Sequence, residues 1–112
     1  MVTVKQLKEE LGMKMLTSCD DGKEIAKGYI CDLLSWVMAK GQEKMAWITV
    51  QTHLNVIAVA CLHDFACVII PENIEVPQES IDKANEEGIC VLSSEKDAYE
   101  IAIGMAKLGI EA

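Results

Sequence analysis

The amino-acid sequence predicts a compact, layered α/β domain in which a central, mainly parallel sheet is flanked by helices. Half of the 112 residues are apolar (51%), but only 4% are aromatic. Small and aliphatic side chains must therefore fill the interior, which suits layered α/β packing better than a sandwich built on aromatic pairs. From residue 45 onward, strand patterns alternate with helix patterns, as in parallel strands joined by right-handed crossovers. A chain of this length holds one core, so residues 1–112 are expected to form a single domain.

The first half of the chain is predicted to contain two helices and two strands. Thr3 and Gln6 have the spacing of a capping box, and Gly12 is a stop signal, so the first helix lies between them. A polar, acidic turn at residues 18–23 separates two strands. Asp32 is expected to be the N-cap of the second helix. The predicted elements are a helix between Thr3 and Gly12, strands 13–16 and 24–31, and helix 33–40 ending at Gly41.

The second half is predicted to alternate between strands and helices. Pro77 suits the first turn of a helix that Gly88 ends, and residues 94–97 are expected to cap the last helix. Only the apolar run 54–62 is ambiguous, because its periodicity fits a buried strand or a buried helix. Its alanines, and the absence of the tight turns that consecutive strands need, favour a helix. The predicted elements are strand 45–50, helix 54–62, strand 67–70, helix 78–87, strand 89–92 and a final helix carrying Ala98, Ile101, Ala102, Met105 and Leu108.

A polar cluster, Gln51-Thr52-His53, follows the third predicted strand. One interpretation is structural, with the Thr52 hydroxyl serving as the N-cap of the next helix. The other is functional, because ligands bind open α/β sheets at the carboxyl ends of the strands, where helix N-termini present free N–H groups. Asp32 and Ser35 follow the second strand in the same way. We predict that Gln51 and His53 face a shallow polar cleft beside Asp32 and Ser35, with Thr52 acting as the cap.

Charge and composition exclude several classes of partner. The chain has a net charge of −8 and no arginine. Residues 45–112 supply the whole excess, with three lysines against eleven acidic residues. Such a surface repels nucleic acid. No apolar run approaches the ~20 residues of a membrane span, and the amino terminus lacks a secretory signal pattern, so a soluble, cytoplasmic protein is expected.

The five cysteines are expected to be free thiols in a reducing compartment. They form no CxxC pair and are odd in number, and Cys61, Cys67 and Cys90 lie in apolar runs, where a thiol behaves as a small hydrophobe. Cys61 and His63 are two residues apart, so on a helix they point about 200° apart and cannot share a metal ion. No metal site is predicted.

Common catalytic motifs are absent from the sequence. It contains no GxSxG, which gives nucleophilic catalysis no support. It also has no GxGxxG and no P-loop, which argues against a stand-alone kinase, ATPase or dehydrogenase. The sequence indicates no particular cofactor.

The helix at residues 54–62 is apolar on nearly all sides and therefore needs cover all round. One face of a small sheet covers one side only. Helices 32–40 and 95–108 supply the rest in one interpretation, and a second copy of the chain supplies it in the other. We predict a homodimer.

Three stretches of the sequence resemble the DRTGG domain family. They are GYICDLLSWVMA (28–39), WITVQTHLNVIAVACL (47–62) and CVIIPENIEVPQESIDKANEEGICVLSS (67–94), and the Leu11-Gly12 segment and the tail helix extend the resemblance to nearly the whole chain. The resemblance implies a fold like that of the amino-terminal domain of HPr kinase/phosphorylase and of Mur ligases. DRTGG domains stand alone or are fused to CBS domains or phosphotransacetylase-type enzymes, which implies a regulatory, ligand-sensing or dimerising module.

The chain departs from the family pattern at one loop. Where DRTGG domains commonly show Thr-Gly-Gly after a strand, this sequence has Pro71-Glu72-Asn73. The change removes glycine N–H groups that suit an anion and adds a negative charge. We therefore predict a non-enzymatic regulatory or ligand-sensing homodimer. The alternatives are a small-molecule enzyme or binding protein that uses residues 51–53 with Asp32, and an interaction subunit that docks on a protein partner through the acidic second half.

Overall fold

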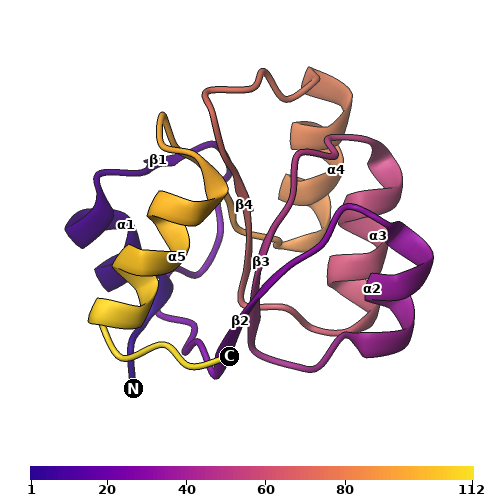
Figure 1. The fold of residues 1–112 in the computed structure, drawn as a ribbon. Helices are drawn as coiled ribbons and strands as arrows, with labels where there is room; N and C mark the ends of the chain where they lie inside the picture. The colour runs from indigo at the N-terminus through magenta and orange to yellow at the C-terminus, as the bar shows by residue number, and fades with distance from the viewer.

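In the computed structural model, which describes residues 1–112, five strands form one mixed sheet (Figure 1). The strands lie in the order β1-β5-β4-β3-β2. Strands β2 to β5 are parallel, and β1 pairs antiparallel with β5. The mainly parallel sheet that the sequence predicts is therefore confirmed. The strands are β1 (Lys14–Met15), β2 (Lys27–Ile30), β3 (Met45–Ile48), β4 (Cys67–Ile70) and β5 (Val91–Ser93).

Five helices cover the two faces of the sheet. Figure 1 shows α1 and α5 on one side and α2, α3 and α4 on the other. Each face has its own apolar core, and neighbouring residues of β3 divide between them, because successive strand residues point to opposite faces. Ile48 packs in the α1/α5 core, whereas Trp47 packs in the α2/α3/α4 core. The helices are α1 (Val4–Leu11), α2 (Leu34–Lys40), α3 (Leu54–Leu62), α4 (Gln78–Glu87) and α5 (Ala98–Lys107).

Several local signals act as predicted. Thr3 and Gln6 form a capping box at the start of α1. Gly12 and Gly88 end α1 and α4 in the left-handed conformation (φ 63° and 71°), which glycine adopts without a steric penalty. The ambiguous apolar run is the helix α3, with the predicted bounds Leu54–Leu62. None of the five helices has the length and continuous hydrophobicity that crossing a bilayer requires.

Two predicted caps are wrong. Asp32 does not cap α2, whose N-cap is Leu33, without a side-chain hydrogen bond. The Asp32 carboxylate accepts hydrogen bonds from Thr49 and Val50 instead. Thr52 does not cap α3, because His53 stands at that position and its ring accepts from the Asn55 N–H. At α3, His53 is one residue nearer than Thr52 to the start of the helix. The last helix begins as predicted, because Asp97, the final residue of the segment 94–97, caps it in a capping box with Glu100.

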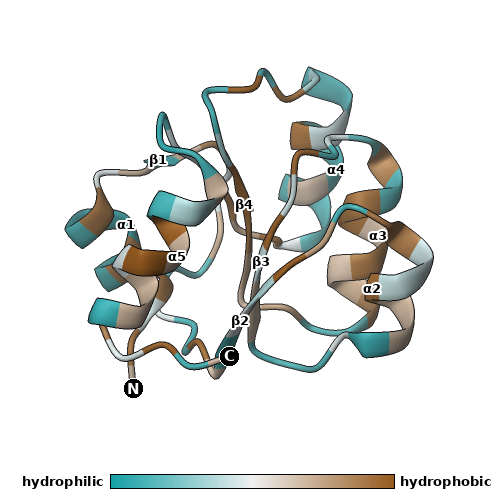
Figure 2. Ribbon diagram, viewed as in Figure 1, coloured by the Kyte–Doolittle hydropathy of each residue, from teal (hydrophilic) through white to brown (hydrophobic).

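Helix α3 is covered within the chain. It packs between α2 and α4, and Val56, Ile57, Val59 and Ala60 are buried. The covering helices are thus α2 and α4, not the helix at 95–108. Figure 2 shows the result, with hydrophobic segments on α2 and α3 facing one another and mostly hydrophilic residues along α4. The apolar character of this helix therefore does not require a second copy of the chain.

The prediction of five free thiols is wrong. A disulfide joins Cys19 to Cys90, whose Cα atoms are 5.4 Å apart, a normal separation for a disulfide. Cys19 lies in the turn before β2, and the buried Cys90 lies just before β5. The two residues are 71 positions apart. Sequence spacing gave no sign of this pair, because only the sheet order brings the two segments together.

The three remaining cysteines are free and differ in environment. Burial raises the pKa of Cys67 to about 12, so this thiol is unreactive at neutral pH. A hydrogen bond to the Glu87 carboxylate (3.4 Å), together with desolvation, raises the pKa of the exposed Cys61. Glu87 in turn pairs with Lys83 at 3.2 Å, and the hydrogen bond from Lys83 lowers the pKa of Glu87. This exposed group lies on α3 and α4, away from the predicted ligand site.

Candidate functional site

Four of the five predicted site residues lie at the carboxyl ends of β2 and β3. Two segments form this corner, residues 31–33 after β2 and residues 49–53 between β3 and α3. Parallel pairing of β2 with β3 places both segments at the same edge of the sheet. We refer to residues 31–33 and 49–53 together as the polar corner.

Asp32 ties the two segments of the polar corner together. Its Oδ1 accepts from the Thr49 hydroxyl and from the Val50 N–H, both at 2.9 Å. Thr49 is buried, and Asp32 is exposed. The carboxylate therefore holds the end of β3 instead of capping its own helix, since hydrogen bonds to a charged acceptor are the stronger kind.

Gln51 continues this network towards the surface. Its N–H donates to the Thr49 hydroxyl oxygen (3.2 Å), and its side-chain amide Nε2 donates to the Asp32 carbonyl (3.3 Å). The side chain is nevertheless exposed. The prediction that Gln51 lies beside Asp32 is borne out by these contacts. The amide oxygen of Gln51 has no partner within the chain, so it is free to accept a hydrogen bond.

His53 and Thr52 exchange the roles that the sequence predicts for them. The His53 Nδ1 accepts from the Asn55 N–H at 3.1 Å and so carries no proton in this arrangement. Its Nε2 has no partner in the chain. Thr52 contributes its carbonyl, which accepts from the buried Ser80 hydroxyl of α4 at 2.6 Å. Ser80, which sequence reasoning missed, therefore anchors the polar corner to α4.

Ser35 is not part of the hydrogen-bonded corner. It is exposed on the first turn of α2 and makes no hydrogen bond to the other candidates. Four of the five predicted side chains thus belong to the two segments, and the fifth lies one helix turn away along the chain.

The Pro71-Glu72-Asn73 loop adopts a conformation that glycine favours. Glu72 and Asn73 both have left-handed backbones, with φ of 59° and 56°. Their N–H groups donate to the carbonyls of Lys96 and Ser94, both at 2.8 Å. These donors are therefore used to attach the loop to the segment after β5, and they are not free for an anion.

We expect Glu72→Gly to raise the free energy of unfolding by up to about 1 kcal/mol. The left-handed conformation costs an L-residue roughly 1–2 kcal/mol, and the greater freedom of glycine in the unfolded chain offsets about 0.5–1 kcal/mol of that gain. Urea unfolding measures the change. Asn73→Gly is the matched control and should give a smaller gain, because asparagine tolerates this conformation. A clear loss of stability in Glu72→Gly would contradict the strain argument.

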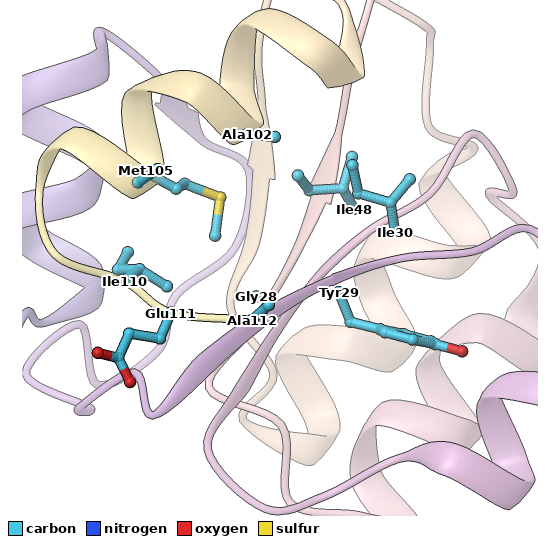
Figure 3. Close-up of a pocket in the computed structure, with 10 residues that line it drawn as sticks. Gly28, Tyr29, Ile30, Ile48, Ala102, Met105, Ile110, Glu111 and Ala112 are labelled. Atoms are coloured by element: carbon cyan, nitrogen blue, oxygen red, sulfur yellow. The ribbon is translucent and has the colours of Figure 1, made fainter.

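An apolar hollow of the molecule lies beside β2, not in the polar corner. It is a cavity of about 350 Å³ between β2 and α5, open at the surface. Figure 3 shows Met105 pointing from α5 into it, opposite Ile30 and Ile48. A Cβ on Gly28 would lie 2.9 Å from the Met105 Cε, so the glycine leaves room there. The residues that line the cavity are Gly28, Tyr29, Ile30, Ile48, Ala102, Met105, Ala106, Ile110, Glu111 and Ala112.

Sequence reasoning missed this cavity, although a signal for it exists. Ala102 and Ala106 are one turn apart on α5 and face the strand position occupied by Gly28. Small residues on both sides of a contact leave space that larger ones would fill. Without the pairing of α5 with β2, the two sets of small residues have no visible relation.

The chemistry of the polar corner is that of a binding surface. His53 and Asp32 make no contact with one another, and neither lines the cavity beside β2 or the hollow near the termini. No group of three His, Cys, Asp or Glu side chains is placed to hold a metal ion. The polar corner presents a carboxylate, an amide and an imidazole, and hydrogen bonds to the Thr49 and Ser80 hydroxyls hold its backbone in place.

Comparison with known proteins finds a solved structure with a similar fold. No protein-family model matches the sequence, and no curated protein matches it either. A similar solved structure is that of the CBS and DRTGG domains of the regulatory region of Clostridium perfringens pyrophosphatase, complexed with the activator diadenosine tetraphosphate. The TM-score is 0.69 at 12% sequence identity, over 90% of this chain and 44% of that chain. The fold resembles part of a regulatory region. At this identity the likeness concerns the fold alone, and it is consistent with the DRTGG-like architecture that the sequence resemblance implies.

Proposed function

We propose that residues 1–112 form a DRTGG-like regulatory module that senses a small molecule without catalysing a reaction, and that works as a homodimer. The observation that carries this proposal is the construction of the polar corner. Asp32, Thr49 and Ser80 hold its backbone by hydrogen bonds, whereas the side chains of Gln51 and His53 are exposed. A preorganised backbone with outward polar groups suits binding. The similarity to a regulatory region supports the same function at the level of the fold.

The ligand that fits the polar corner is neutral or cationic and carries hydrogen-bond donors. The Gln51 amide oxygen and the second Asp32 carboxylate oxygen are free to accept hydrogen bonds from it. The His53 Nε2–H is free to donate, because Nδ1 accepts from Asn55, so the ligand also needs one acceptor. The chain has a net charge of −8 and no arginine, and the N–H groups of Glu72 and Asn73 are already bonded. A polyphosphate would therefore find few partners here, although the activator of the similar regulatory region is one.

Binding at the polar corner would act on three helices of one sheet face. Asp32 lies one residue before the N-cap of α2, His53 caps α3, and Ser80 connects the corner to α4. A ligand that repositions residues 49–53 would therefore shift the positions of α2, α3 and α4 together. A sensor of this kind changes the surface that it presents to a partner.

To test the proposal, each probe is titrated into isotope-labelled protein, and the amide NMR signals are recorded at every step. Spermidine and adenosine represent cationic and neutral ligands, and ATP represents the polyphosphates. We expect a neutral or cationic probe to shift the amide signals of residues 49–55 while ATP leaves them unchanged. Gln51→Ala and His53→Ala should each weaken that binding at least tenfold, with stability falling by no more than about 1 kcal/mol for the lost cap.

Gln42→Ala, an exposed change at the far end of α2, is the matched control and should bind normally. The proposal fails if none of the neutral or cationic probes moves these signals, or if ATP is the probe that does. Marked destabilisation by Gln51→Ala would also contradict it, because the amide would then serve stability.

Cytoplasmic location is part of the same proposal. The Cys19–Cys90 disulfide is the observation against it, because reducing compartments keep thiols reduced. Trapping of thiols at the moment of cell lysis decides the point: five alkylated cysteines agree with a reducing compartment, and three agree with an oxidising one.

A further inference from the structure

One edge of the sheet is open. β2 is the last strand in the order and pairs only with β3. The Gly28 N–H points away from β3 and donates to the Glu111 carbonyl at 2.8 Å. Alternate residues of a strand direct their backbone groups to the same side, so the backbone of Ile30 also faces outward. The carboxyl-terminal segment bonds to Gly28 and does not reach Ile30, which leaves this position available to another strand.

Exposed apolar side chains gather on the elements around this edge. Apart from Met1, every exposed large hydrophobic residue lies on β2, on α2 or the residue before it, on α5, just after β3 or at the end of α3. In Figure 2, hydrophobic segments of α2 and α5 lie on either side of β2. Ile30 itself is 47% exposed and Trp36 53%. The residues are Ile30, Leu33, Trp36, Met38, Val50, Leu62, Tyr99 and Ile103.

The same elements are poor in negative charge. β2 and α2 contain Lys27 and Lys40 and no acidic residue, and α5 contains Glu100 and Lys107. These elements together carry a charge of +2, so the rest of the chain carries −10. Two of those acidic residues, Asp32 and Glu111, lie beside the β2 edge and offset the charge of +2. Two copies of so acidic a protein repel one another over most of their surfaces. The side that carries β2, α2 and α5 is where that repulsion is least and where apolar area is available.

We propose that two copies of this chain associate through their β2 edges, antiparallel about a two-fold axis near Ile30. In this arrangement Ile30 exchanges a pair of N–H···O bonds with Ile30 of the partner subunit, and the two sheets become continuous. Helices α2 and α5 each approach the same helix of the partner, so the contact is isologous and closes. The partner also covers the mouth of the cavity between β2 and α5. This inference deepens the homodimer of the proposed function and depends on it.

A stable contact would cover a modest fraction of the chain's surface. A standard interface removes about 800 Å² from each partner, which is about one seventh of the 5924 Å² that this chain exposes. Exposed tryptophan and tyrosine side chains, such as Trp36 and Tyr99, are the residues that contribute most in such interfaces.

Mass measurement by light scattering on the full chain tests the association. We expect twice the 12.3 kDa of one chain at tens of micromolar, and monomer mass for Ile30→Lys, whose exposed position should allow the domain to fold. Ala58→Lys, at an exposed site on α3 outside this set of residues, is the matched control and should stay dimeric. A monomeric wild-type chain, or a dimer that Ile30→Lys leaves intact, overturns the proposal.

Crosslinking provides a positive readout that does not depend on disrupting the dimer. Residues facing each other in a hydrogen-bonded antiparallel pair have Cα atoms about 5.5 Å apart, within disulfide reach. In a Cys61→Ser background, Ile30→Cys should form a disulfide-linked dimer on mild oxidation, and Ala58→Cys should not. Equal crosslinking of the two variants contradicts the assigned axis. Ligand binding at the polar corner by a protein that stays monomeric would refute this inference and leave the sensing function standing.

Discussion

Reduction of the Cys19–Cys90 disulfide is expected to lower the free energy of unfolding by about 4 kcal/mol. The bond closes a loop spanning 71 positions, and in the chain-entropy treatment such a loop restricts the unfolded state by about this amount. Few single changes in a domain of this size have a larger effect. Urea unfolding with and without dithiothreitol measures it, and the midpoint should fall in the reduced sample.

Matched variants separate the bond from its surroundings. Cys19→Ala should lower stability in the absence of reductant and abolish the response to dithiothreitol. Cys61→Ser, which changes an exposed free thiol, should retain the full response. Thiol counting in denaturant should find three free thiols in the oxidised wild-type protein. Five thiols and an unchanged midpoint would mean that the pair is not bonded in solution, as the sequence alone predicts.

Asp32→Ala is expected to lower the free energy of unfolding by about 2–3 kcal/mol. The change removes the acceptor of the Thr49 hydroxyl and the Val50 N–H. Thr49 is only 1% exposed, so its hydroxyl loses a charged partner that water does not readily replace, and a buried unpaired polar group carries a penalty of this order. Chemical unfolding monitored by Trp47 fluorescence, whose indole lies next to the same segment, measures the loss.

Two further variants identify the hydrogen bond as the cause. Asp32→Asn keeps an acceptor oxygen and should lose about 1 kcal/mol or less. Thr49→Val removes the donor, so Asp32→Ala should be milder in that background, and the double-mutant cycle gives the coupling between the two side chains. If Asp32→Ala and Asp32→Asn are both neutral, the polar corner is not held by this carboxylate, and the argument for a preorganised site fails with it.

The polar corner shows where local reasoning stops. The sequence places Asp32 before a helix and Thr52 before another, and each residue type is a good N-cap. In the structure the Asp32 carboxylate bonds across to the next strand end instead, because parallel pairing brings Thr49 and Val50 within its reach. Thr52 is displaced from the cap by His53, the residue immediately before α3. Which side chain caps a helix depends on all the groups that lie near it in space, whereas the sequence shows only which residues are adjacent along the chain.

The homodimer illustrates the same limit at the surface. The apolar pattern of α3 predicts self-association, yet α2 and α4 cover that helix within one chain. Apolar side chains that remain exposed are found instead around β2, on elements whose individual patterns are unremarkable. Whether an apolar helix is covered depends on which helices share its face of the sheet, and this follows from strand order.

The sequence by itself determined the alternation of strands and helices, the mainly parallel sheet, the limits of α3, and the positions where Gly12 and Gly88 end helices. These features depend on periodicity and backbone preference, which act over a few neighbouring residues. The meeting of Asp32 with Thr49, the bond between Cys19 and Cys90, the cavity between β2 and α5 and the open edge at Ile30 were decided only by the tertiary structure. Each joins segments from different parts of the chain, and their contact depends on the order β1-β5-β4-β3-β2, which no local pattern specifies.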